Sequence, residues 1–228
     1  SGNKVFSTSQ EVRLADKTPV TTSFPVQTPE LWSVDAPVLY RVEVSVSSGG
    51  REYDRISIPF GIRTIAFSAE KGFQLNGKSL KLKGGCLHHD NGLLGAVAID
   101  RAEERKVELL KANGYNAVRC SHNLTSEYFL DACDRLGMLV IHETFDQWQK
   151  PKRDNDYHQF FDEWGVKDLT AGVRRDRNHP SIIMWSIGNE IQERADAKGE
   201  EIAEKLVSAI KQYDDSRFTT AGVNWFWD

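Results

Sequence analysis

Five short apolar runs alternate with four amphipathic helical patterns after residue 80, and this alternation constrains the fold more than any other feature. The expected strands are residues 81–88, 116–122, 138–143, 182–188 and 217–225. Strands separated by helices run parallel, either in an open doubly wound sheet or in a (β/α)8 barrel. No glycine-rich phosphate loop follows any of these strands, which weakens the nucleotide-binding alternative. We therefore expect an α/β fold containing the first five strands of an eight-stranded TIM barrel.

The helical patterns have recognisable ends. The first begins at Asp100, where Asp100 and Glu103 are spaced as a capping box, and it ends at Gly114. The second ends at Gly137. The third and fourth are marked by apolar residues at helical spacing, namely Val166, Leu169, Val173, Ile202, Leu206, Ile210 and Tyr213.

The residues before the alternation have a β pattern of a different kind. Apolar and polar residues alternate in 38–46, which predicts a half-buried strand, and a Ser-Gly-Gly turn leads to a second such strand. Val12, Leu14 and residues 20–26 are weaker strand candidates in a proline-rich region. We expect residues 1–63 to form an incomplete immunoglobulin-like β-sandwich and residues 64–228 to form the N-terminal part of the barrel domain. A hairpin over 72–82, with Asn76-Gly77 in its turn, follows the sandwich.

Composition excludes several classes of protein. Hydrophobic residues make up 39% of the chain, which is enough for a packed core and too many for a disordered chain. The formal net charge of −4 provides no basic surface, so we expect neither a nucleic-acid nor a membrane partner. No apolar run approaches the ~18 residues of a membrane span, and the first ten residues lack the apolar core of a signal peptide. The odd number of cysteines predicts buried free thiols at Cys86, Cys120 and Cys133.

Polar residues follow every expected strand. They are Cys86-Leu87-His88-His89-Asp90, Arg119-Cys120-Ser121-His122-Asn123, His142-Glu143, Asn189-Glu190 and Asn224-Trp225. Because the carboxyl ends of parallel strands meet on one face, we expect these side chains to converge there. Carboxylates, amides, histidines and arginines pair with sugar hydroxyls, and Trp148 or Trp225 could stack on a pyranose ring. The pattern is typical of a carbohydrate site.

Four segments carry a resemblance to a known family: "FGIRTIAF", "KLKGG", "NAVRCSH" and "RDRNHPSIIMWSIGNE". Together they resemble glycoside hydrolase family 2, the β-galactosidase and β-glucuronidase group. The resemblance covers nearly the whole chain, from the end of an immunoglobulin-like domain to the fifth strand of the catalytic barrel. It implies an exo-acting retaining β-glycosidase. We favour a β-galactosidase because the residues that read a glucuronide carboxylate lie beyond this chain, with β-mannosidase as a weaker alternative and a non-catalytic carbohydrate-binding fragment as another.

The resemblance assigns Glu190 as the general acid/base and Asn189 as the partner of the sugar 2-hydroxyl. The chemistry agrees, because the glycosidic oxygen must be protonated as it leaves and a carboxylic acid can donate that proton. The alternative is that both residues begin the next helix, as its cap and first-turn acid. In the family the nucleophile is a Glu on the seventh strand, which we expect beyond this chain. The chain alone is therefore expected to be inactive.

The resemblance also places His88, Asp90, Arg119 and His122 in the sugar subsite. For His88 and His122 the alternative is a hydrogen-bonded core histidine. For Arg119 the alternative is an internal ion pair with Glu143, and this alternative is compatible with the subsite role.

Two carboxylates, Glu143 and Asp146, are expected on the same face, where they would orient the substrate or neighbouring side chains. An inverting reaction through one of them is a weaker alternative. His142 stands where the family usually has Asp, and it would change the charge around Glu143. Trp148, in the long loop 145–157, is either a stacking platform or an apolar anchor of that loop.

We expect no cofactor and no metal. A zinc site is a minor alternative, although its C-x-H spacing is unusual, and it would use Cys86, His88, Cys120 and His122. The family's magnesium ligands would fall on Gln147 and Gln149, which are poor ligands for a hard cation. A full-length protein could be a homo-oligomer. The compartment is not fixed by the sequence, and the resemblance suggests a bacterial periplasm or cytoplasm.

Overall fold

The computed structural model describes residues 4–13 and 19–224. The chain divides into two compact units, Ser1–Glu30 and Leu31–Asp228, which are described separately. The described part of the first unit forms neither helix nor strand, so the strand predictions at Val12 and residues 20–26 are wrong, and Leu14 lies outside the described residues. Pro25 interrupts the second stretch and cannot donate to a strand ladder. The prediction of a domain boundary after residue 63 stays a prediction.

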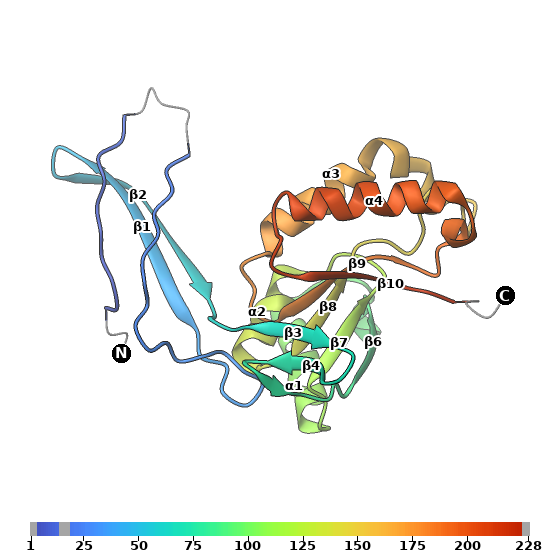
Figure 1. The fold of residues 1–228 in the computed structure, drawn as a ribbon, viewed down its shortest axis with the longest axis horizontal. Coiled ribbons are helices and arrows are strands. Elements are labelled where there is room, and N and C mark those ends of the chain that lie inside the picture. The colour runs from blue at the N-terminus through green and yellow to red at the C-terminus, as the bar shows by residue number, and fades with distance from the viewer. Residues whose placement is uncertain (1–3, 14–18, 225–228) are drawn as a thin grey trace. The chain divides into compact units, whose positions relative to one another are not determined.

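The second unit begins with an antiparallel hairpin, β1 (Tyr40–Ser48) and β2 (Arg51–Phe60) (Figure 1). Its turn is confirmed, with positive φ at Gly49 and Gly50. The register aligns Val44 with Ile56, so the apolar residues share one face. Val44 and Ile56 keep 47% and 49% of their surface exposed, so the predicted half-burial is wrong here. A sheet face becomes buried only when a second layer covers it.

A small antiparallel sheet follows, in the order β3 (Ile65–Ser68), β4 (Gly72–Leu75) and β5 (Lys78–Ser79). The predicted turn is confirmed, because Asn76 and Gly77 both have positive φ. The strand β3 was not predicted. Side chains of this sheet pack with the amino ends of the barrel strands in one cluster, which includes Phe73, Leu75, Ala117, Leu139 and Ile183.

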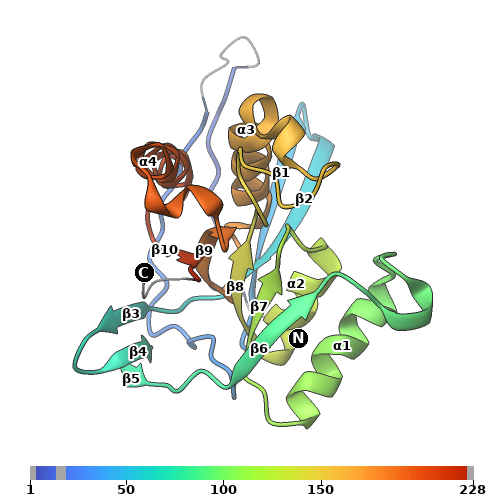
Figure 2. The ribbon, with the colours of Figure 1, turned by 90° about the vertical axis from the view of Figure 1, so that its right-hand side faces the viewer.

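The main sheet is parallel and has the order β10-β9-β8-β7-β6 (Figure 2). Its strands are β6 (Gly84–His88), β7 (Ala117–Ser121), β8 (Leu139–Glu143), β9 (Ile182–Asn189) and β10 (Phe218–Gly222). The predicted α/β fold is confirmed as the N-terminal part of a TIM barrel, preceded by a sandwich-like part. The fifth strand is shorter than predicted, and Trp225 lies outside the described residues.

Four helices pack against one face of this sheet: α1 (Asp100–Ala112), α2 (Glu127–Leu136), α3 (His158–Asp176) and α4 (Ala197–Lys211). Short 3-10 turns occupy Gly92–Leu94 (η1) and Gln192–Ala195 (η2). The predicted end of α2 at Gly137 is confirmed, and this glycine has a left-handed backbone. The capping box at Asp100 is wrong, because Ile99 is the N-cap and the buried Glu103 side chain accepts a hydrogen bond from Asn91 instead.

The link between the hairpin and the barrel is fixed by Arg63. Its Nε donates to the Pro180 carbonyl at 2.7 Å and its Nη2 donates to the Ile182 carbonyl at 2.6 Å. Gly61 lies so close to Pro180 that an added Cβ would be 2.7 Å from the proline ring. These contacts attach the "FGIR" segment to Pro180 and to the start of β9. Among the described residues, no helix is long and apolar enough to cross a membrane.

Candidate active site

The carboxyl ends of β7, β8 and β9 bring Arg119, Glu143 and Asn189 into direct contact, as the strand-end pattern predicts. Arg119 donates to Glu143 Oε2 from Nε at 2.9 Å and from Nη2 at 2.7 Å. The same Nη2 donates to Asn189 Oδ1 at 2.7 Å. The guanidinium therefore joins three neighbouring strands, and the predicted internal ion pair of Arg119 is confirmed.

Glu143 is the anchor of this network. Its side chain has 0% exposure, and besides Arg119 it binds Ser186 Oγ at 2.6 Å and His122 Nδ1 at 2.7 Å. Burial alone would lower the pKa of Arg119, but the hydrogen bonds and charge of Glu143 outweigh it and raise that pKa. Glu143 is thus a buried carboxylate whose oxygens are occupied by protein donors.

Asn189 is fixed by partners on both sides of its amide. Oδ1 accepts from Arg119, while Nδ2 donates to Asp146 Oδ1 at 2.9 Å. Asp146 also accepts from Lys152 Nζ at 2.7 Å. Burial would raise the pKa of Asp146, but the hydrogen bonds from Lys152 and Asn189 outweigh it and lower that pKa. The network sets which amide atom faces which partner.

Glu190 differs from its neighbours because its side chain is exposed. Its backbone has a φ of 47°, and its N–H donates to the Gly222 carbonyl at 2.6 Å. Within the described part of the chain, no hydrogen bond engages its carboxylate. The helix-start alternative is wrong, because Ile191 is the N-cap of the following 3-10 turn and Asp196 caps α4. The strand end therefore presents this carboxylate to solvent.

The remaining subsite candidates divide into two groups. His122 is held by Glu143, and its ring meets the exposed His88 edge-to-face at 5.1 Å, so the core-histidine alternative is wrong for His88. Asp90 is exposed in the turn after β6, where its Oδ1 accepts from the Gly92 N–H at 3.4 Å. The structure brings His88 and His122 together and leaves Asp90 apart from the Arg119 network.

Trp148 is buried, with 4% exposure. Its indole N–H donates to the Ile187 carbonyl at 2.8 Å, and its ring lies 6.3 Å from that of Phe161. This geometry favours the anchor of the long loop over the stacking platform.

The four residues of the zinc alternative are not assembled. Cys86 lies beside Arg119, whose Nη1 donates to Sγ at 3.5 Å, whereas Cys120 packs in the core between sheet and helices. The prediction of buried free thiols is right for Cys120 and Cys133 and wrong for the exposed Cys86. Burial raises the pKa of the Cys120 thiol to about 12.

Gln147 and Gln149, at the positions of the family's magnesium ligands, are not arranged as a metal site. Gln147 is buried, and Gln149 donates to Asp162. Among the described residues, the side chains close enough to share an ion are instead Asp131 and Asp134 of α2 and His179, which precedes β9. The expectation of no metal and no cofactor stays a prediction.

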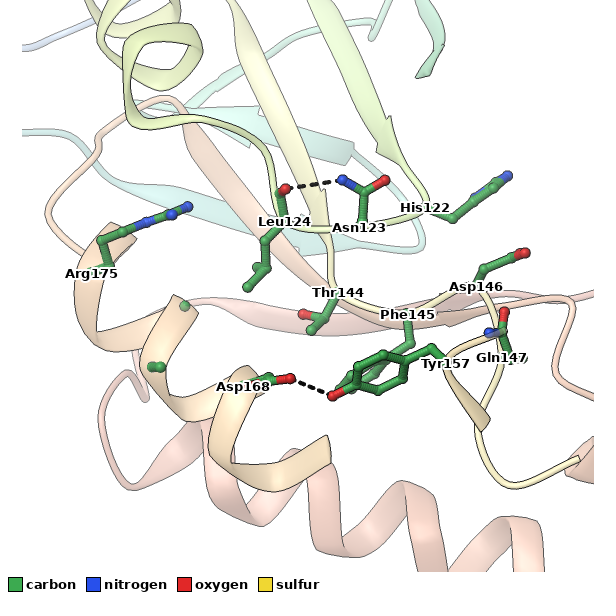
Figure 3. Close-up of a pocket in the computed structure, with 12 residues that line it drawn as sticks. His122, Asn123, Leu124, Thr144, Phe145, Asp146, Gln147, Tyr157, Asp168 and Arg175 are labelled. Carbon is green, nitrogen blue, oxygen red and sulfur yellow. Dashed lines mark hydrogen bonds between the residues drawn. The ribbon is translucent and has the colours of Figure 1, made fainter. Parts of the chain in front are cut away.

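A pocket of about 450 Å³ lies beside the network. His122 and Asp146 are at one end of it and Arg175 is at the other (Figure 3). Tyr157 and Phe145 form part of the wall, and the Tyr157 hydroxyl donates to Asp168 at 2.5 Å. Glu190 is not among the residues that line this pocket.

Comparison with known proteins agrees with this arrangement. The sequence model of glycosyl hydrolases family 2, TIM barrel domain, matches residues 68–225, and a second model, glycosyl hydrolases family 2, matches residues 1–63. The chain belongs to glycosyl hydrolase family 2.

Relatives within family 2 carry more than one activity in their names. The chain is 41% identical to "Beta-galactosidase BoGH2A" of Bacteroides ovatus, over 98% of this chain and 30% of that protein. It is 33% identical to "Beta-glucuronidase" of Bacteroides fragilis, over 87% of this chain and 29% of that protein. A solved family 2 member from Bacteroides cellulosilyticus is 57% identical with a TM-score of 0.86, covering 88% of this chain and 26% of that one. The chain thus spans less than a third of these relatives.

His142, the departure from the family 2 pattern, lies on the face of β8 opposite Glu143. Its Nε2 is 2.9 Å from Asp176 Oδ2, and its ring stacks on Trp185 at 5.7 Å. His142 therefore makes no direct contact with Glu143. The expected change around Glu143 does not arise from a contact between the two side chains.

Three residues of the site were missed in this family 2 sequence. Ser186 is the one hydroxyl within the apolar run 182–188, and that signal could have identified it. Gly222 lies where an added Cβ would be 2.5 Å from Arg119 Nη2, and a glycine inside a strand is a known sign of close approach. Lys152 belongs to a polar loop whose pattern gives no such signal.

Proposed function

We propose that a full-length protein containing this chain is an exo-acting retaining β-glycosidase, with Glu190 as the general acid/base. One observation carries this assignment. Asn189 is held rigidly by Arg119 and Asp146, whereas the adjacent Glu190 carboxylate is exposed and free of protein hydrogen bonds among the described residues. A carboxyl group that donates a proton to a substrate must be free of protein partners, as Glu190 is within the described chain. A side chain that orients a sugar hydroxyl must be held in place, as Asn189 is.

In the proposed reaction Glu190 protonates the glycosidic oxygen as the bond breaks. It then takes a proton from the water that releases the sugar. Asn189 would hydrogen-bond the 2-hydroxyl, using the lone pair and N–H that its protein partners leave available. A second carboxylate ~5 Å away would be the nucleophile in a retaining enzyme, and we expect it in the part of the barrel beyond this chain.

The inverting alternative is weakened by the contacts of its two candidate carboxylates. Glu143 is fully buried and receives four hydrogen bonds, so it cannot activate water without breaking the network. Asp146 Oδ1 is shared by Lys152 and Asn189. Both carboxylates are better suited to orienting other groups than to reacting.

For the substrate, we propose a terminal β-D-galactoside. The support is the 41% identity to the Bacteroides ovatus β-galactosidase over nearly the whole chain. β-Glucuronide is the second candidate, because a putative β-glucuronidase of Formosa agariphila is 38% identical over 97% of this chain. β-Mannoside is a weaker alternative.

The test is hydrolysis of aryl β-galactoside, β-glucuronide and β-mannoside by the full-length protein and its Glu190→Gln variant. We expect turnover of the galactoside, and in the variant a loss that is greatest for poor leaving groups. Turnover of the glucuronide instead would change the substrate but keep the mechanism. No turnover of any glycoside would refute the assignment and favour the non-catalytic carbohydrate-binding fragment. An active but unimpaired variant would refute Glu190 as the general acid/base.

A further inference from the structure

The peptide group between Asn189 and Glu190 is held from both of its sides. Its carbonyl oxygen, Asn189 O, accepts from Lys152 Nζ at 2.9 Å. Its N–H, on Glu190, donates to the Gly222 carbonyl at 2.6 Å. These two contacts fix the plane of the peptide, and that plane helps set the φ of Glu190.

The fixed plane matters because Glu190 has a φ of 47°. A residue with a side chain seldom adopts this left-handed backbone, and it persists where surrounding contacts hold it. The direction in which the Glu190 side chain leaves the backbone depends on the same torsion. The two contacts on the Asn189–Glu190 peptide therefore help to set the direction of the Glu190 carboxylate.

Lys152 reaches this peptide from a loop that runs along the segment after β9. Lys150 N donates to Glu193 Oε1 at 2.6 Å, and Gln192 Nε2 donates to the Pro151 carbonyl at 2.9 Å. Lys152 Nζ makes the third contact in this series, to Asn189 O. Three consecutive loop residues thus hold the segment that carries Glu190.

The Lys152 ammonium is also neutralised locally. It lies 2.7 Å from Asp146 Oδ1, its side chain is 22% exposed, and the same Asp146 oxygen accepts from Asn189 Nδ2. Asp156 fixes the loop backbone by accepting from the Lys152 N–H at 2.8 Å. One cation therefore holds the main chain of Asn189 directly and its side chain through Asp146.

We propose that Lys152 is a positioning residue for the general acid, acting on Glu190 through the Asn189–Glu190 peptide. This inference rests on the proposed role of Glu190 as proton donor. Without the ammonium, the Asn189 carbonyl loses its donor on that side, and the peptide plane can rotate. The Glu190 carboxyl then spends less time in line with the leaving oxygen, and proton donation slows.

The test compares Lys152→Met with Lys150→Met in the full-length protein. Lys150 is a matched control, because it is in the same loop and its Nζ pairs with the exposed Asp196 rather than with the peptide. The readout is kcat/KM for a phenyl and a dinitrophenyl glycoside of the sugar that the protein cleaves. The value of kcat/KM reports the step in which the leaving group departs. Phenolate is a poor leaving group and needs a proton from the general acid, whereas dinitrophenolate departs without one.

We expect Lys152→Met to lower kcat/KM for the phenyl glycoside by ~10- to 100-fold and for the dinitrophenyl glycoside by less than ~3-fold. Lys150→Met should change neither. Lys152→Arg should recover part of the phenyl activity, because a guanidinium can still donate to the carbonyl.

Equal losses on both substrates, or no loss on either, would overturn the positioning role. If Lys152→Met does not fold, Lys152→Arg and Lys152→Gln are compared with the same two substrates. A positioning role predicts that the loss of kcat/KM on the phenyl glycoside, relative to the dinitrophenyl glycoside, is larger for Gln than for Arg. Failure of this inference is separable from failure of the proposed function. A leaving-group effect in Glu190→Gln without one in the Lys152 variants refutes the inference alone, and an unimpaired Glu190→Gln refutes the function.

Discussion

Two donor atoms of Arg119, Nε and Nη2, converge on a single oxygen of Glu143, at 2.9 and 2.7 Å. This contact fixes the plane of the guanidinium, because one edge of it is tied to a carboxylate with no exposed surface. The Nη2 atom then reaches Asn189 Oδ1 in a set direction. The orientation of Asn189 thus depends on a carboxylate one strand away.

Replacing Glu143 by Gln should reduce both stability and activity. The amide cannot accept from Arg119, Ser186 and His122 as the carboxylate does, and it leaves a part-buried guanidinium without its counter-charge. We expect the free energy of unfolding to fall by ~2–4 kcal/mol and kcat/KM by ~100-fold, measured by denaturant titration and steady-state kinetics. Glu163→Gln is the control, since Glu163 is 70% exposed beside Lys167. Full activity in Glu143→Gln would contradict this account of Asn189.

Gly222→Ala should disturb the same network from the opposite side. The new methyl group would be 2.5 Å from Arg119 Nη2 and 3.2 Å from Asn189 Oδ1, and the hydrogen bonds of Arg119 leave it little freedom to move. We expect a loss of kcat of ~10-fold or more, with a smaller effect on the melting temperature. Gly85→Ala is the matched control, because its Cβ would meet nothing closer than 4.0 Å. Similar kinetics for both variants would show that Gly222 has no special role.

The His179–Asp134 pair should make stability depend on pH. Burial lowers the pKa of His179, but the hydrogen bond with Asp134 at 2.7 Å and its charge outweigh burial and raise that pKa above 6.5. A histidine with a raised pKa stabilises the fold fully below its unfolded pKa, and this contribution disappears as pH rises through the folded value. His179→Gln should therefore cost ~1–2 kcal/mol at pH 5 and less at pH 9.

Chemical unfolding at several pH values would measure this difference between His179→Gln and the parent protein. The exposed His89 provides the control variant, His89→Gln. A stability difference that is constant with pH, or that grows as pH rises, would be inconsistent with a protonated His179 paired to Asp134.

We expect no functional magnesium ion at Gln147 and Gln149, so removal of divalent metal should leave the activity of the full-length protein unchanged. Amide oxygens are weaker ligands for magnesium than carboxylates, and the Gln149 amide already donates to Asp162. The measurement is kcat/KM for the aryl glycoside before and after dialysis against a chelator. Loss of activity that magnesium restores would disprove this prediction.

The strand pattern predicts the part of the site that depends only on topology. Glu143 and Asn189 are the last residues of β8 and β9, and Arg119 lies two residues before the end of β7. Parallel strands bring such positions together at one edge of the sheet. Lys152 could not be found in this way, because its contact depends on the path of an irregular loop. The strand β3 was also missed, since four residues give too few alternations to distinguish a strand from a linker.

The prediction that β1 is half-buried failed for a related reason. The pattern in β1 identifies an apolar face, but only a covering layer decides whether that face is buried. Trp148 is a second case: the sequence leaves open a stacking platform or an apolar anchor, and the burial of the ring and its hydrogen bond to Ile187 favour the anchor. Local sequence defines which side chains share a face and leaves open what lies against it.

The small sheet β3–β5 lies against the amino ends of the barrel strands, where Phe73 and Leu75 pack with Ala117, Leu139 and Ile183. On the described strands, the packed apolar side chains of this cluster cover the amino ends. We therefore expect a ligand at Asn189 and Glu190 to enter and leave from the carboxyl ends of the strands. Under the proposed function, access from one side suits the end of a sugar chain better than its middle.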